Sequence, residues 1–140
     1  MNPVPPAPWP SVVLDSEGVW SVARNDSEDV RAVLAASREA GVPVLVPTAV
    51  LAETLYGDAR DARASQVLKR LTVVAITEQL ARAAAGLKRA AGMSGVAATI
   101  DAIVVAVSLA FGGGVVLTSD IHDMRALALH APARVRAIPV

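Results

Sequence analysis

The sequence predicts an α/β fold with a mostly parallel central sheet. Short aliphatic runs such as Ser11–Leu14 and Val115–Leu117 are typical of strands buried on both faces of a parallel sheet. These runs alternate with longer segments that carry helix caps and helical periodicity, which is the pattern of layered α/β domains. Only 3% of the residues are aromatic, although 54% are hydrophobic. We therefore expect a core made of many small aliphatic contacts between helices and sheet.

The N-terminal part of the chain predicts two strands with a helix between them. Ser11–Leu14 forms the first strand, which ends at Asp15. Asn25–Ser27 offers N-cap side chains for a helix that Gly41 closes. Val42–Val46 follows as the second strand.

Helical patterns fill most of the middle of the chain. Ala49–Tyr56 is expected as a helix directly after the second strand, and Asp61–Arg70 as an amphipathic helix. Val73–Ile76 is expected as the third strand. Thr77–Ala91 reads as a further helix, with the threonine as its N-cap.

The C-terminal third predicts two helices and two strands. Ala97–Phe111 is expected as a helix, which Gly112–Gly114 breaks before the strand Val115–Leu117. A short helix over His122–Leu129 and a strand over Val135–Ile138 complete the chain. In open parallel sheets, ligands bind outside the carboxyl ends of the strands, so this edge is the expected place of a site.

We expect one domain over residues 11–140, preceded by a disordered or extended proline-rich leader over residues 1–10. The leader has neither the basic nor the apolar region of a signal peptide. The longest apolar stretch, residues 96–111, is shorter than the roughly 18 to 20 residues that cross a membrane. These features predict a cytoplasmic protein without membrane contact.

The charge balance and the absence of cysteine narrow the chemistry. The chain carries 13 basic and 13 acidic residues, so no global field attracts nucleic acid or an anionic membrane. Without cysteine there is no thiolate nucleophile and no cysteine-ligated zinc. Only His122 and His130 offer imidazole, so we expect any bound metal to be held by oxygen atoms.

Asp101 is the most informative residue, because it stands alone within the apolar run Val96–Val107. An ionised carboxylate in such surroundings costs several kcal/mol unless it is paired or coordinates a metal. Asp15, Glu53 and Asp120 also follow apolar segments. Converging carboxylates match the oxygen ligands that Mg²⁺ and Mn²⁺ prefer, and such a site supports phosphodiester hydrolysis.

Each of these acids also has a structural interpretation. Asp15 fits a turn, Glu53 a helix surface, and Asp120 an N-cap. Asp101 would be explained as a cap only if its helix began there and not several residues earlier. The four positions taken together favour one functional site.

Four blocks carry a resemblance to a known family. They are Val13–Ser16, Val46–Glu53, Ile100–Ala106 and Leu117–Asp120. In this order they resemble PIN domains, and in particular the VapC-type toxins of bacterial toxin–antitoxin pairs. The resemblance implies a three-layer α/β/α fold and an endoribonuclease that depends on Mg²⁺ or Mn²⁺.

The resemblance also implies residue roles and partners. Asp15, Glu53, Asp101 and Asp120 would be catalytic, and Asp15, Asp101 and Asp120 would hold the metal. The substrate would be RNA. The partner would be a small antitoxin that inserts a segment into the acidic crevice, and the toxin would be a homodimer. The family often has another acid one turn before Asp101, where this chain has Ala97 and Ala98.

Supporting roles are expected for three residues near the last block. Asp123 shares a helix face with Asp120, although a first-turn acid also complements the helix dipole. Thr118 and Ser119 offer hydroxyls that suit a metal-bound water or a phosphate, or a helix cap. Trp9, Trp20 and Tyr56 are too scattered along the sequence to predict a base-stacking surface. Four arginines follow the acidic blocks as candidates for binding phosphate, although an ordinary surface role is the favoured interpretation of each: Arg24, Arg60, Arg63 and Arg125.

Two alternative functions remain open at the level of sequence. Phosphatases of the haloacid dehalogenase type also place an aspartate after the first strand, but they need a second one two residues later, where this chain has Glu17. A catalytically silent PIN-like module that only binds protein or RNA would differ by showing no stabilisation by metal.

Overall fold

The computed structural model describes residues 8–131 and 133–140 of the chain. The leader expected over residues 1–10 therefore lies outside the described residues as far as residue 7. Trp9 is buried, with 7% of its surface exposed. Its indole N–H donates to the Ser37 hydroxyl at 3.2 Å, so the chain already packs against the second helix before the first strand begins.

The centre of the molecule is a parallel sheet with the strand order β3-β2-β1-β4-β5. Every neighbouring pair is parallel, which confirms the prediction of a mostly parallel sheet. Val13 in the central strand pairs with Leu45 on one side and Val116 on the other. The strands are β1 Val12–Leu14, β2 Val44–Pro47, β3 Thr72–Val74, β4 Gly114–Thr118 and β5 Val135–Pro139.

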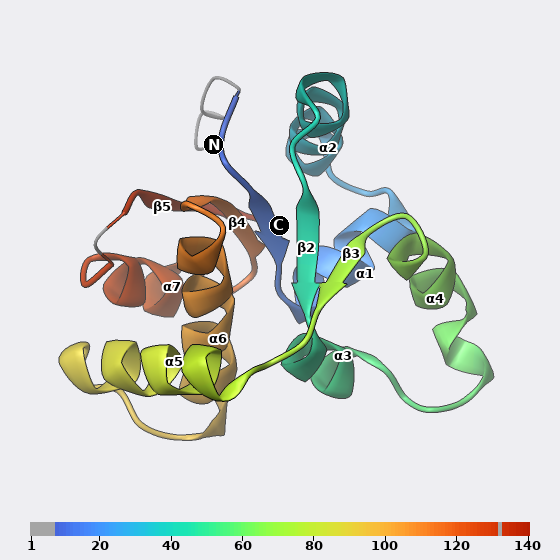
Figure 1. The fold of residues 1–140 in the computed structure, drawn as a ribbon. Helices are drawn as coiled ribbons and strands as arrows, with labels where there is room; N and C mark the ends of the chain where they lie inside the picture. Colours follow the sequence, from blue (N-terminus) through green and yellow to red (C-terminus); the bar gives the residue numbers. More distant parts are fainter. Residues whose placement is uncertain (1–7, 132) are drawn as a thin grey trace.

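Helices cover both faces of this sheet, so the fold is a three-layer α/β/α arrangement (Figure 1). α5, α6 and α7 lie on one side, α1, α2 and α4 lie on the other, and α3 follows the carboxyl end of β2. The helices are α1 Ser16–Arg24, α2 Glu28–Ala40, α3 Thr48–Thr54, α4 Ala62–Leu68, α5 Glu78–Ala90, α6 Val96–Ala110 and α7 Ile121–Ala128, with the short 3₁₀ turn η1 Ala59–Asp61 before α4.

Helix α1 is absent from the sequence-based assignment. Asp15 begins it as N-cap, with its carboxylate accepting from the backbone N–H of Gly18. Asn25, which was a candidate cap for the next helix, instead ends α1 in the left-handed conformation with φ of 54°. Ser27 is the N-cap of α2. The glycine and β-branched residues within α1 are weak helix formers, so packing on the sheet decides its conformation.

Helix α6 settles the structural interpretation of Asp101. The helix begins at Val96 after Gly95, so Asp101 lies in its second turn and caps nothing. Residues 101–108 are all buried, because this helix packs between the sheet, α5 and α7.

Within the described ranges, no helix combines the length and the apolar character that crossing a bilayer requires.

Candidate functional site

The acidic residues gather at the carboxyl edge of the sheet. Asp15 follows the last residue of β1, and Asp120 lies two residues beyond the end of β4. β1 and β4 are neighbours, and the chain leaves β1 towards one face and β4 towards the other. Such a switch point is where open parallel sheets bind their ligands.

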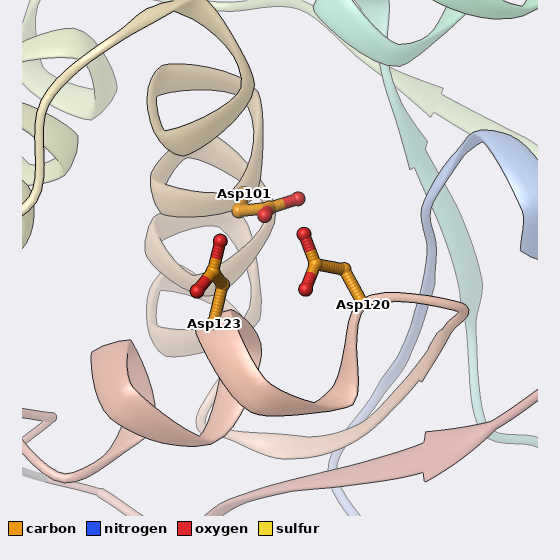
Figure 2. Close-up of side chains that lie close together, drawn as sticks. All are labelled: Asp101, Asp120 and Asp123. Atoms are coloured by element: carbon orange, nitrogen blue, oxygen red, sulfur yellow. The ribbon is translucent and has the colours of Figure 1, made fainter.

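Three carboxylates converge on one point between α6 and α7. One oxygen each of Asp101, Asp120 and Asp123 lies within 4.8 Å of the other two. Figure 2 shows the carboxylate of Asp101 reaching from α6 towards those of Asp120 and Asp123 at the start of α7. We call these three residues the acid cluster. The sequence predicts only a supporting role for Asp123, whereas the structure places it within the cluster.

The environment of Asp101 strongly disfavours its charge. Burial raises the pKa of Asp101 to about 8, together with the negative charge of Asp120, a side-chain hydrogen bond shared with Asp120, and the charges of Asp15 and Asp123. Its Oδ2 atom is buried and has no hydrogen-bond partner among the described residues. Buried polar atoms are nearly always satisfied, so this oxygen indicates a missing partner such as a cation.

Asp15 joins the ends of β1 and β4 to the first turn of α1. Its Oδ1 accepts from the N–H of Gly18 at 2.7 Å, and its Oδ2 from the N–H of Ser119 at 3.2 Å. Burial raises the pKa of Asp15, while hydrogen bonds from Thr118 and from those two amides act in the opposite direction. Its charge in turn contributes to the raised pKa of Asp101.

Glu53 lies beside Asp15 on α3 and outside the acid cluster. Partial burial and then the charge of Asp15 raise the pKa of Glu53. The hydroxyl of Thr54 donates to that of Ser16 at 3.1 Å, which ties α3 to the start of α1. Glu53 therefore lies close enough to Asp15 to respond to its charge, although it belongs to another element.

Thr118 and Ser119 act on the site in different ways. Thr118 is buried, and its hydroxyl accepts from the N–H of Asp120 at 2.9 Å. Ser119 contacts the site through its backbone N–H, which donates to Asp15. Asp120 occupies the N-cap position of α7 but makes no side-chain cap bond, so its carboxylate is free to face Asp101.

Arg24 has an ordinary surface role, whereas the aromatic residues are arranged differently from the expectation. Arg24 is paired with Glu17 and Asp26 at 3.2 and 2.7 Å. Trp20 and Tyr56, which are distant in the sequence, have ring centroids 6.2 Å apart. No periodicity signals this pairing, because it depends on how α1 packs near the segment that follows α3.

A groove of ≈ 1190 Å³ lies between α1, α2 and α4, away from the acid cluster. Apolar residues such as Val30, Leu34 and Val67 form part of its wall. No acidic residue of the described chain lines it. We call it the arginine groove, after Arg24, Arg31, Arg38, Arg63 and Arg70.

Comparisons with known proteins agree with this fold. VapBC2 from Rickettsia felis, bound to a promoter DNA fragment, has a TM-score of 0.63 at 13% identity, covering 92% of this chain and 98% of its own. DNA-bound VapBC from Salmonella typhimurium has a TM-score of 0.60 at 16% identity, covering 92% and 97%. FitAB bound to a DNA fragment has a TM-score of 0.57 at 17% identity, covering 91% of this chain and 94% of its own. A search of curated protein sequences found no match. Residues 12–128 match the model of the PIN domain, and the chain therefore belongs to the PIN domain family.

Proposed function

We propose that this chain is a metal-dependent endoribonuclease that acts as the toxin of a VapBC-type toxin–antitoxin pair. The observation that carries the proposal is the unpartnered Oδ2 of Asp101 beside two further carboxylates within 4.8 Å. Three like charges this close disfavour one another unless a cation lies between them. PIN family membership and the solved VapBC and FitAB complexes support the nuclease and toxin assignments.

The donor set fits Mg²⁺ or Mn²⁺. All of the donors are carboxylate oxygens, which hard divalent cations prefer, and the chain has no cysteine. Asp101 and Asp120 would hold the ion, with Asp123 on the α7 side and Asp15 on the β1 side. Asp15 can contribute because a carboxylate has about four lone-pair sites, and the hydrogen bonds from Gly18, Ser119 and Thr118 leave one of them open.

Each carboxylate has a distinct task in phosphodiester hydrolysis. A bound Mg²⁺ or Mn²⁺ would activate water and neutralise charge on the phosphate. Asp15, fixed by Gly18 and Ser119, keeps the ligands at the ends of β1 and β4 in register. Glu53 faces Asp15 from α3, and its raised pKa suits accepting a proton from the attacking water.

The solved neighbours are complexes named VapBC and FitAB, so we infer a small antitoxin for this chain as well. The arginine groove is complementary to an acidic, partly apolar segment. Because α1 carries Asp15 at one end and Arg24 at the other, one bound segment can cover the groove and reach the acidic crevice. We also propose that the chain forms a homodimer and is located in the cytoplasm.

The two alternative functions differ in their support. Membership of the PIN family favours a nuclease over a haloacid dehalogenase-type phosphatase. Glu17, at the position where that phosphatase family needs its second aspartate, is instead paired with Arg24 on the surface of α1. A silent PIN-like binding module would neither gain stability from metal nor cut RNA, so metal titration and a cleavage assay decide between it and a nuclease.

The test is RNA cleavage by the purified chain with Mg²⁺ or Mn²⁺ and with chelator. We expect metal-dependent cleavage by the unchanged protein and at least about a hundredfold loss in Asp101→Asn, since removing one catalytic group typically costs that much. Glu39→Gln, at an exposed position of α2, is the control and keeps full activity. A metal-independent reaction, or wild-type cleavage by Asp101→Asn, would refute the assignment.

A further inference from the structure

An exposed stack of three side chains lies where α1, the end of α3 and η1 meet. The Trp20 and Tyr56 rings are tilted by 50°, with centroids 6.2 Å apart. The guanidinium carbon of Arg60 lies 4.0 Å from the centroid of the Tyr56 ring. Tyr56 nevertheless keeps 59% of its surface exposed. We call Trp20, Tyr56 and Arg60 the aromatic platform.

The loop after α3 holds Tyr56 in place. The backbone N–H groups of Tyr56 and Gly57 donate to the buried carboxylate of Asp61 at 2.9 and 2.7 Å. Arg60 is held in turn by Asp58, with its Nη2 2.7 Å from Oδ2. An aromatic ring that is exposed and yet fixed from several directions is ready to bind another planar group with little loss of entropy.

The platform is close in the chain to two acidic residues of the proposed site. Asp15 is the N-cap of α1, and Trp20 lies five residues later, which is about 7.5 Å of helix rise. Glu53 precedes Tyr56 by three residues. The hydroxyl bond between Thr54 and Ser16 joins the two helices at this point. A single RNA strand that runs from these acidic residues along α1 therefore reaches the aromatic platform.

We propose that an unpaired base of the RNA substrate stacks on the aromatic platform next to the cleaved bond; this inference rests on the proposed nuclease function. Bases stack on tyrosine and tryptophan rings and on arginine planes without needing a particular sequence. Arg60 is already neutralised by Asp58, so the platform favours a base over a phosphate.

The experiment measures the affinity for an unstructured RNA of about twelve nucleotides, a length within the usual range of single-strand sites. It uses the full chain carrying Asp101→Asn, so that the RNA stays intact. We expect Tyr56→Ala to weaken binding by about 5- to 150-fold and Tyr56→Phe to bind like the parent. The matched control is Phe111→Ala, an exposed aromatic at the end of α6 near the opposite edge of the sheet, which keeps the parent affinity.

A second arm leaves the protein unchanged and scans single abasic nucleotides through the same RNA. One abasic position should weaken binding to the parent protein and have no further effect on Tyr56→Ala, because both changes remove the same contact. Equal affinities of Tyr56→Ala and the parent, or an equal loss in Phe111→Ala, overturn the proposal. So does a change in oligomeric state in Tyr56→Ala without loss of RNA affinity, which would make the platform a contact between copies.

Cleavage assays on protein that keeps Asp101 distinguish base stacking on the platform from the proposed nuclease function. Tyr56→Ala should raise KM more than it lowers kcat, since a stacked base contributes equally to the ground state and the transition state. RNA that binds through Tyr56 but is never cut would contradict the proposed nuclease function and still support base stacking on the aromatic platform. RNA that is cut equally well at all concentrations by Tyr56→Ala would contradict the platform alone.

Discussion

At the scale of the residue, Asp101 and Asp15 have opposite effects on stability although both belong to one proposed site. Asp101 is a buried carboxylate with an unpartnered oxygen and negative neighbours. Asp15 is buried too, but two backbone amides donate to it and it begins α1. Without metal, the first residue therefore works against the fold and the second supports it.

We predict that Asp101→Asn stabilises the metal-free protein increasingly as the pH rises from about 4 to about 8. Over this window the unfolded chain has lost the Asp101 proton, while the folded chain with a pKa of about 8 retains it, so folding of the unchanged protein weakens as the pH rises. At pH 8 the gain in unfolding free energy should exceed about 1.4 kcal/mol, which is the value of one pKa unit. Urea unfolding at several pH values measures it. A pH-independent difference, or one shared by Glu39→Gln, contradicts the assigned environment.

The substitution Asp15→Ala should instead lower stability at neutral pH. Loss of an N-cap side chain costs about 0.5 to 2 kcal/mol, and the N–H of Ser119 also loses its acceptor. Thermal unfolding with chelator present isolates this effect from metal binding. An unchanged melting temperature would show that Asp15 has no structural role.

At the scale of the element, the contact between α1 and β4 positions the site. A Cβ atom on Gly18 would lie 2.7 Å from the backbone oxygen of Leu117 and 3.2 Å from the Cβ of Leu14. Only glycine allows the first turn of α1 to approach the sheet this closely. That approach also keeps Asp15 within reach of Ser119.

Gly18→Ala should therefore destabilise the protein by about 1 to 3 kcal/mol, the usual cost of overpacking, and reduce cleavage because Asp15 moves. Gly86→Ala is the matched control, since a Cβ there meets nothing within 4 Å in the middle of α5. It should stabilise the protein by about 0.5 to 1 kcal/mol. Equal effects of the two substitutions in denaturant unfolding would rule out the close contact.

Local sequence signals predicted most elements but not the way they meet. The aliphatic runs and glycine stops were sufficient for all five strands, and caps such as Thr77 for most helices. Helix α1 was missed because Gly18 and the valines obscure its pattern and Asn25 suits either end of a helix. The spacing of Asp123 from Asp120 suggested a shared face, but its closeness to Asp101 depends on how α7 packs on α6.

At the scale of the whole molecule, two surfaces of opposite charge lie near opposite ends of α1. One is the acidic edge of the sheet, and the other is the arginine groove. The chain has no net charge, so the separation of the two signs is local. This separation fits the proposal that one antitoxin segment binds the arginine groove and extends from there to the acidic residues.

The double substitution Arg38→Glu and Arg70→Glu should weaken binding of the proposed antitoxin by at least about tenfold, because like charges then face each other. The metal-dependent cleavage by the free toxin should stay unchanged. Arg89→Glu, on α5 across the sheet, is the control. Unaltered affinity in calorimetry with the small protein encoded beside the toxin would place that partner elsewhere.

The most direct measurement is the unfolding free energy of the chain with increasing Mn²⁺. If the acid cluster holds a cation, stability rises as RT ln(1 + [L]/Kd), about 2.7 kcal/mol at a hundred times Kd, and Asp101→Asn loses most of this gain. Glu39→Gln keeps it. A chain whose stability does not respond to Mn²⁺ or Mg²⁺, or an Asp101→Asn variant that responds like the unchanged protein, would contradict the proposed metal site.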